Sequence, residues 1–221
     1  GYEKDGFLHY LDLGPNVNSY KKFTKKSIGR KLNTASLKNF HKEKEIDKTG
    51  QITDVLKSGD QILVQVSKEP ISSKGPRLTT EISIAGRHMV LLPFSNKISL
   101  SNKIKSQDEK VRLKRLLQSI KPEGFGVIVR TVAKGKKVVE LDTDLKNLYK
   151  KWQGVFKELK NANAPQQILK ELNRSSAILR DILNEGFNNI HVNDKELYLK
   201  LKDYLVSISP EQEKILKLYK S

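Results

Sequence analysis

The sequence predicts a mixed α/β protein, and two observations support this fold class. Between residues 61 and 92, apolar and polar residues alternate in short runs separated by turn residues, which is typical of β-strands with one buried face. From residue 106 onward, apolar residues recur mostly at helical spacing, with brief β-branched runs between them. The 221 residues can hold one large domain or two small ones around a buried core.

The N-terminal part combines a short apolar segment with a strongly basic stretch. The apolar segment reaches Leu13, and Gly14-Pro15-Asn16 then indicates a turn. Residues 20–48 carry many Lys and Arg residues and few large aliphatic ones. This basic stretch is interpreted as a solvated, mobile loop or as an arm that grips phosphates, and the two interpretations are compatible. Its candidate phosphate contacts are Lys25, Lys26 and Arg30.

Three short strands are predicted next. Residues 61–68 alternate, with Ile62, Val64 and Val66 on one face. A polar loop at 72–76 leads to a second alternating run, residues 78–84, and a third, buried strand follows at 89–92. Short strands and turns at this spacing are typical of a small barrel or of an OB-type fold.

Helices dominate the rest of the chain. A capping box at 106–109 opens a helix that Pro122 ends, and residues 126–131 form a short buried strand. A long helix from about Asp142 carries an apolar stripe that contains Trp152, so we assign this indole to the core rather than to base stacking. A helix from Pro165 to Leu183, a strand at 190–192 and a helix at 197–206 complete the predicted elements.

The charge balance indicates a polyanionic partner. There are 42 Lys and Arg residues against 25 Asp and Glu residues, which leaves a net charge of +17. Such a surplus favours nucleic acid, through neutralised phosphates and released counterions. Acidic lipid is the alternative, but no basic amphipathic helix with a large apolar face stands out.

Several classes of protein are excluded or disfavoured. The absence of cysteine excludes disulfides, thiol catalysis and zinc-thiolate sites in this chain, and it fits a reducing compartment. No apolar run approaches the roughly 18 residues needed to span a bilayer, and no signal peptide is visible. We therefore expect a cytoplasmic protein without a membrane span, and the start at Gly1 leads us to expect a fragment.

No catalytic site is predicted in this chain. The four histidines are scattered, and no phosphate-binding loop of the Walker type is present. Asp142 and Asp144 are expected to cap a helix. Asp181 and Glu185 lie four apart on a helix face, with arginines nearby to neutralise them, whereas two-metal hydrolysis needs several convergent carboxylates. A nuclease that uses Asp181 stays open as a weaker alternative.

Candidate anion-binding residues are better supported. Arg130 stands at the end of a predicted strand, directly before Thr131, where its guanidinium can pair with two phosphate oxygens. Gly86 lets a backbone approach a ligand closely, and Lys74 lies in a loop that suits a phosphate contact. Phe7 offers a stacking surface. Each signal is weak alone, because a strand-end Arg is more often in a structural ion pair and a lone Phe is more often in the core.

These residues carry a resemblance to the ribonuclease E/G family of bacterial endoribonucleases. Residues 62–70, 74–80 and 82–86 resemble the family's strand ending in Lys-Glu, its Lys-Gly loop, its Leu-Thr-Thr run and its Ser-x-Ala-Gly step. The match continues at residues 90–93 and 122–131, and Arg180-Asp181 resembles the family's Arg-Asp segment.

The resemblance implies a fold and a set of site residues. The implied fold is a partial OB-type RNA-binding domain at 1–85, a 5′-sensor subdomain at 86–135 and an incomplete RNase H-like α/β subdomain at 136–221. In the family, the sensor recognises a 5′-monophosphate and stimulates cleavage of single-stranded RNA. Arg130 and Thr131 match the phosphate-binding pair, Gly86 and Val90 match the pocket lining, and Phe7 and Lys74 match RNA contacts. Asn102-Lys103 stands where the family often has an Arg-Arg pair, so the resemblance implies a weaker contribution from Lys103.

The resemblance also implies what lies outside this chain. The parent protein would be a Mg²⁺-dependent, homo-oligomeric endoribonuclease of RNA processing and decay, including ribosomal RNA processing. Its metal-binding aspartates and zinc-linking cysteines would follow Tyr219, so no catalytic residue or metal ligand is expected here. A non-catalytic basic RNA-binding module, such as a ribosome-associated one, is the alternative.

Overall fold

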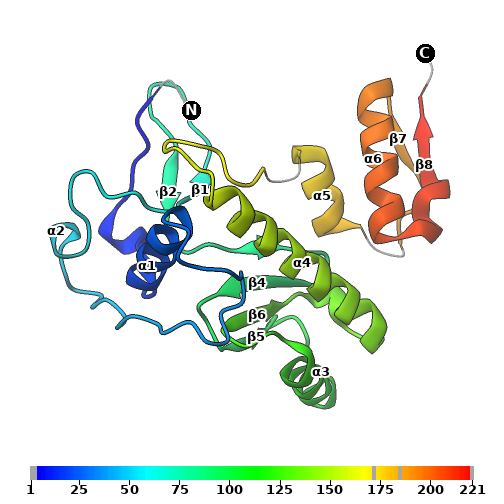
Figure 1. The fold of residues 1–221 in the computed structure, drawn as a ribbon. Helices are drawn as coiled ribbons and strands as arrows, with labels where there is room; N and C mark the ends of the chain where they lie inside the picture. Colours follow the sequence, from blue (N-terminus) through cyan, green and yellow to red (C-terminus); the bar gives the residue numbers. More distant parts are fainter. Residues whose placement is uncertain (1–3, 171–172, 184–185, 220–221) are drawn as a thin grey trace. The chain divides into compact units, whose positions relative to one another are not determined.

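The computed structural model describes residues 4–170, 173–183 and 186–219. The chain divides into two compact units, Gly1–Leu169 and Lys170–Ser221 (Figure 1). Both units combine helices with short strands, which confirms the predicted mixed α/β class. Among the described residues the strands form one sheet of four and two pairs, and none of these closes into a barrel. The division into three domains stays a prediction.

A four-stranded sheet organises the first unit. Its order is β3 (Ile84–Ala85), β4 (Met89–Pro93), β6 (Phe125–Val129) and β5 (Ile98–Leu100). β4 runs antiparallel to β3 and β6, and β5 runs parallel to β6. As a result β3, β5 and β6 all finish at the end of the sheet where β4 begins. We call this the Arg130 end, and we call the opposite end, where β4 finishes, the Phe94 end.

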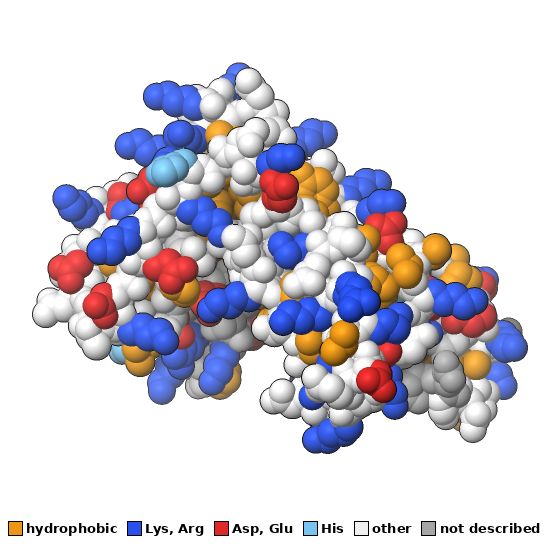
Figure 2. All heavy atoms as spheres, turned by 90° about the horizontal axis from the view of Figure 1, so that it is seen from below, with side chains coloured by type: hydrophobic (Ala, Val, Ile, Leu, Met, Phe, Trp, Pro, Cys, Tyr) orange, Lys and Arg blue, Asp and Glu red, His pale blue; other side chains and the backbone are white. Residues whose placement is uncertain are grey.

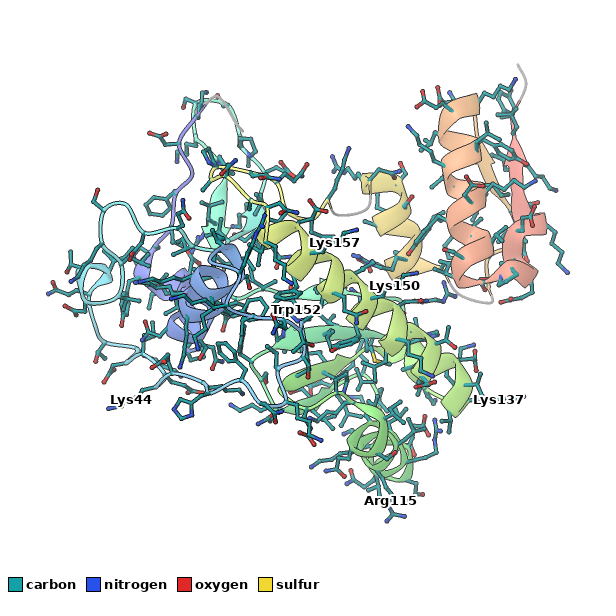
Figure 3. All side chains as sticks on the ribbon, in the orientation of Figure 1. Lys44, Arg115, Lys137, Lys150, Trp152 and Lys157 are labelled. Atoms are coloured by element: carbon teal, nitrogen blue, oxygen red, sulfur yellow. The ribbon has the colours of Figure 1, made fainter. Side chains whose placement is uncertain are left out.

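One face of this sheet forms the core with the long helix α4 (Val138–Leu159), which crosses it in Figure 1. Met89, Leu91 and Val127 alternate inward along the strands, as the 2-residue period of a strand requires, and are fully buried. Trp152 points from α4 into this core (Figure 3) and donates its indole N–H to the Ala35 carbonyl at 2.9 Å. The assignment of Trp152 to the core is therefore confirmed.

The helix α3 (Gln107–Ile120) covers the β5 side of the sheet. Its N-cap is Ser106, whose hydroxyl accepts the Glu109 N–H at 3.3 Å, so the predicted capping position is confirmed. Leu113 and Leu117 bury the inner stripe of this helix. On the outer face of the sheet Ile128 remains 40% exposed.

The basic stretch at 20–48 is folded against the core, so the expected mobile, solvated loop is wrong. Its first part belongs to helix α1 (Val17–Ile28), whose Tyr20 and Phe23 are buried. Phe23 stacks on Trp152 with ring centroids 5.1 Å apart. The irregular segment that follows places Ala35 and Leu37 in the same core. The large buried side chains of α1 are mainly aromatic, whereas the loop prediction rested on the scarcity of large aliphatic residues.

Two short strands, β1 (Gln65–Lys68) and β2 (Arg77–Thr79), form an antiparallel hairpin. The buried face predicted for residues 61–68 is wrong at Val66, which is 37% exposed because β1 pairs only with β2. The second run keeps Thr80, Ile82 and Ile84 buried, as predicted. It is nevertheless two strands rather than one, because the Ile82 N–H turns back to the Thr80 carbonyl at 3.1 Å.

The second unit pairs β7 (Ile190–Val192) in parallel with β8 (Leu216–Leu218), and α6 (Lys195–Ile208) lies between them in sequence. Leu179, Leu183 and Leu205 form its core with α6. The helix predicted from Pro165 is wrong at its start: α5 covers Arg174–Ile182, because the Asn173 side chain caps it by accepting the Ser176 N–H at 2.8 Å. Leu172, in that predicted helix, lies outside the described residues. The remaining short elements are η1 (Tyr10–Asp12), α2 (Ile52–Val55), η2 (Thr131–Ala133) and η3 (Pro210–Ile215).

Membrane insertion finds no support in these elements. Over residues 4–170, 173–183 and 186–219, no helix combines the length and the apolar content needed to cross a bilayer.

We expect Trp152→Ala to lower the free energy of unfolding by about 3–5 kcal/mol, because it removes a fully buried ring from the centre of the aromatic cluster. Val139→Ala, on the exposed face of the same helix, should change it by less than about 0.5 kcal/mol. Urea unfolding monitored by circular dichroism measures both variants. Equal effects at the two positions would contradict the described packing of α4.

Candidate nucleic-acid interface

The residues predicted to bind a phosphate come together at the Arg130 end of the sheet. Arg130 follows β6, and its backbone N–H donates to the His88 carbonyl at 2.8 Å, which places the turn at 86–88 beside it. The Thr131 and Ser101 hydroxyl oxygens lie 2.9 Å apart. The Lys103 backbone N–H also reaches the Ser101 hydroxyl, at 3.3 Å. Three loops that are distant in sequence therefore supply one group of donors.

Ser101 links these loops, and sequence reasoning missed it. It directly follows β5, a strand that was not predicted because its apolar residues, Ile98 and Leu100, form too short a run. Since β5 is parallel to β6, with Leu100 opposite Val129, the residues after the two strands must meet. The signal available in the sequence was a hydroxyl residue directly after a short apolar alternation, which is too common to be informative.

Val90 lies on the open face of the sheet beside this end. It pairs with Ile128 across β4 and β6, and Ile128 pairs with Ser99 of β5. Alternate residues of a strand point to opposite faces, so Arg130 lies on the same face as Ile128. The arrangement offers a cation and hydroxyls next to a small apolar surface, which suits a terminal phosphate followed by a sugar and base.

Asp144 holds the turn that contains Gly86. Its carboxylate accepts the backbone N–H groups of Arg87 at 3.3 Å, His88 at 2.9 Å and Met89 at 3.2 Å. A Cβ on Gly86 would lie 2.8 Å from both carboxylate oxygens, so glycine is required for this close approach. The expectation that Asp142 and Asp144 cap a helix is wrong, because α4 begins at Val138 and both residues lie more than a turn inside it.

Two further groups shape the electrostatics of this end. Burial lowers the pKa of His88, and the negative charge of Asp144 opposes that shift. The His88 Nδ1 atom lies 3.9 Å from the Asp144 carboxylate. The Glu109 carboxylate accepts hydrogen bonds from the Arg112 guanidinium and from the Gly135 backbone N–H, and these bonds lower the pKa of Glu109 to about 2.

Phe7 and Lys74 are the predicted RNA contacts: Lys74 lies in the loop of the β1–β2 hairpin, and Phe7 lies in the N-terminal segment that pairs with β2. Phe7 adds to the edge of β2, where its N–H donates to the Pro76 carbonyl at 2.8 Å and its carbonyl accepts the Leu78 N–H at 2.8 Å. Its ring is 58% exposed, so it is not a core residue. Lys74 is exposed in the tight turn that exchanges backbone hydrogen bonds with Ile71. The hairpin therefore presents an aromatic ring and a cation.

The basic stretch divides into structural and exposed cations. Lys21 binds Asp60 at 2.7 Å, and Lys22 binds Glu43 at 2.5 Å, so these two hold the fold together. Lys25 and Arg30 are exposed at the C-terminal end of α1, where Lys26 is half-buried, and Arg30 donates to the Asn161 side chain at 3.3 Å. Figure 2 shows Lys and Arg side chains spread over the face drawn rather than gathered in one patch.

No group suited to metal catalysis is found in the described part of the chain. Within it, no cluster of three or more His, Cys, Asp or Glu residues could hold a metal ion. Asp181 pairs with Arg180, with the Nε and Oδ1 atoms 2.9 Å apart, as the nearby arginines predicted. Glu185, which was predicted to lie beside Asp181 on the helix face, lies outside the described residues. These residues do not fit a Mg²⁺ site, and we assign no chemical step to the ion.

Comparison with known proteins gives consistent matches. The model of the ribonuclease E/G family matches residues 83–221. Ribonuclease E of Nostoc sp. is 34% identical over 95% of this chain and 27% of its own length. The ribonuclease E/G-like protein of Pyropia yezoensis is 34% identical over 92% of this chain and 35% of its own length. Ribonuclease G of Escherichia coli K12 is 28% identical over 99% of this chain and 41% of its own length. The chain thus spans well under half the length of these relatives.

We expect Asp144→Ala to destabilise the first unit by roughly 2–4 kcal/mol, because buried backbone N–H groups at the turn would lose a charged acceptor. Asp142→Ala is the matched control. Asp142 forms only a surface pair with Lys146 at 2.7 Å, whose loss should cost less than about 0.5 kcal/mol. Thermal or urea unfolding of both variants checks this, and equal stability of the two would refute the role of Asp144.

Proposed function

The chain belongs to the ribonuclease E/G family, and on this premise we propose that it is the RNA-binding, 5′-monophosphate-sensing part of a single-strand-specific endoribonuclease of RNA processing and decay. The observation that carries this proposal is the meeting of Arg130, Thr131 and the Lys103 loop at one end of the sheet. Family membership alone would not select these residues as a group.

Each residue at the Arg130 end has a role in this proposal. The Arg130 guanidinium donates two N–H groups to the phosphate oxygens. The Thr131 and Ser101 hydroxyls share one hydrogen bond, so the O–H that this bond does not use donates to the phosphate from the side. Lys103 adds a positive charge. The turn from Gly86 to Val90, fixed by Asp144, positions the terminal nucleotide. A 5′-hydroxyl would leave these donors without an anion, and a 5′-triphosphate would need more space than one compact group of donors offers.

The RNA strand would continue along the exposed cations and the hairpin. Phe7 stacks a base and Lys74 contacts a phosphate, as in sequence-tolerant single-strand binding. Lys25, Lys26 and Arg30 add phosphate contacts at the end of α1. The hairpin with its added Phe7 segment supports a partial OB-type domain. The parallel β7–β8 pair with α6 supports an RNase H-like subdomain in the second unit.

We assign RNA cleavage and Mg²⁺ binding to parts of the whole protein outside this chain. The described residues contain no cluster of metal ligands, and the chain spans 27% of the Nostoc ribonuclease E. In this proposal the whole protein is a cytoplasmic homo-oligomer, and the present chain selects and holds its substrate.

A non-catalytic RNA-binding module is the second candidate, and the net charge of +17 favours it. Such a module would bind RNA through its phosphates regardless of the 5′ end, with a strong salt dependence. A preference for one 5′ end therefore distinguishes the two candidates.

The first test compares the binding of short RNAs with a 5′-monophosphate, a 5′-hydroxyl or a 5′-triphosphate at fixed salt. We expect the wild-type chain to prefer the monophosphate and Arg130→Ala to lose that preference, with about tenfold weaker binding of the monophosphate RNA. Arg115→Ala, which removes an exposed arginine from α3 (Figure 3), removes the same charge and should keep the preference. Equal binding of all three RNAs by the wild type would instead favour the non-catalytic module.

The second test concerns the hairpin. Phe7→Ala should weaken the binding of all three RNAs equally, by about 1–3 kcal/mol, because base stacking does not depend on the chemical group at the 5′ end. Lys74→Ala should lower the slope of log affinity against log salt by about 1. Leu11→Ala is the control for loss of an exposed apolar side chain and should leave RNA binding unchanged. Fluorescence anisotropy over a salt series measures each effect. A wild-type RNA affinity in Phe7→Ala would contradict the proposal that the hairpin contacts the RNA strand.

A further inference from the structure

A pocket of about 370 Å³ lies at the Phe94 end of the sheet, opposite the predicted 5′-sensor. Here β4 finishes and β6 begins, with Pro93 paired to Phe125. The pocket is lined by the segment at 37–42 and by the loop at 121–124. Three of its lining residues are lysines: Lys38, Lys42 and Lys121. None of the residues at the Arg130 end contributes to it.

Two backbone features build this pocket. Gly124 has a φ of +82°, and a Cβ there would lie 2.5 Å from the Leu37 Cβ, so only glycine lets the two segments approach. Phe94 has a φ of +61° although its ring is buried. A bulky residue in this conformation is strained, and such strain is typical of functional sites. The Phe94 carbonyl accepts Lys42 Nζ at 2.6 Å.

Two ammonium groups are held in place within the pocket. Lys42 is anchored by the Phe94 carbonyl, and Lys121 Nζ donates to the Phe125 carbonyl at 3.1 Å. An ammonium has three donors, so one carbonyl bond leaves N–H groups for a ligand. Burial lowers the pKa of Lys42, Glu45 opposes this, and the positive charge of Lys121 lowers it further. Two cations in a partly desolvated pocket favour an anion between them.

The remaining lining residues suit a nucleotide. Glu123 is the only carboxylate among them; it lies 3.8 Å from Lys38, and both side chains are largely exposed. The Phe40 ring is held edge-on against Phe94, with centroids 5.3 Å apart, and lines the pocket. Lys22, which Glu43 neutralises, lies 5.7 Å from the Phe40 centroid. The volume is at the low end of the roughly 300–1,000 Å³ of small-molecule pockets, which fits one nucleotide rather than a dinucleotide.

We propose that this pocket binds a nucleotide, with its phosphate between Lys42 and Lys121 and its base against Phe40. The nucleotide is either free or part of an RNA strand, since both present the same phosphate and base. The site shares no residue with the proposed 5′-sensor, so it stands or fails independently of that proposal.

Isothermal titration with AMP, adenosine and inorganic phosphate at low salt tests the proposal in the 221-residue chain carrying Arg130→Ala, because the proposed 5′-sensor would otherwise also bind the 5′-phosphate of AMP. We expect AMP to bind, adenosine to bind at least about tenfold more weakly, and phosphate to compete with AMP. Lys121→Gln and Lys42→Gln should each lower the affinity for AMP about tenfold. Lys150→Gln, an exposed lysine on α4 (Figure 3), removes one charge elsewhere and should leave AMP binding unchanged.

Lys121→Gln is the deciding variant, because the Lys121 bond to the Phe125 carbonyl, at 3.1 Å, is longer than the 2.6 Å bond of Lys42 to the Phe94 carbonyl, so its loss should affect folding less. Unchanged AMP affinity when Lys121→Gln is added to a folded Arg130→Ala protein would overturn the proposal, as would equal affinity for AMP and adenosine or no binding of AMP. An RNA with a 5′-hydroxyl then identifies the source of the nucleotide: displacement of AMP assigns the pocket to the RNA strand, and simultaneous binding of both assigns it to free nucleotide. The Arg130→Ala background leaves this pocket intact, because Arg130 does not line it.

Discussion

The packing of α4 on the four-stranded sheet is the interaction on which the rest of the first unit depends. From one side of this helix Trp152 fills the aromatic core and fixes the Ala35 segment through its indole N–H. From an earlier turn Asp144 accepts three backbone N–H groups of the turn between β3 and β4. One helix thus stabilises both the hydrophobic core and the loop that borders the proposed phosphate site. Its apolar stripe packs into the core, and its Asp144 carboxylate fixes the turn between β3 and β4.

The sheet carries basic groups at both ends because of its mixed strand directions. The parallel pair β5–β6 brings the Ser101 and Thr131 loops together at the Arg130 end. At the Phe94 end, the antiparallel pairing of β4 with β6 brings the loop before Phe125 next to Phe94. Loops at strand ends are positioned by a rigid sheet, which is why binding residues collect there. Both proposed ligands are phosphates, which accords with the net charge of +17.

The lysines of the basic stretch serve the fold as much as any ligand. Lys21, Lys22 and Lys42 each donate to a backbone carbonyl or a carboxylate, and so attach α1 and the following segment to the rest of the unit. This explains how a stretch so rich in charge can pack onto an aromatic core. Lys and Arg side chains bury their apolar stems while their charged ends remain paired or solvated. Net charge counted along the sequence therefore overstates the number of cations available to bind an anionic partner.

By itself the sequence determined the features that arise from local patterns. These are the mixed α/β class, helix α3 with its Ser106 cap, strands β4 and β6, the core position of Trp152 on α4, and a basic protein suited to nucleic acid. Only the tertiary structure decided the burial of α1, the partners of Asp144, the contact between Ser101 and Thr131, and the lysine-lined pocket. The physical reason is that periodicity and capping act over a few residues, whereas these contacts join segments far apart in the chain. Their geometry follows from strand order and helix packing, and no local pattern encodes either.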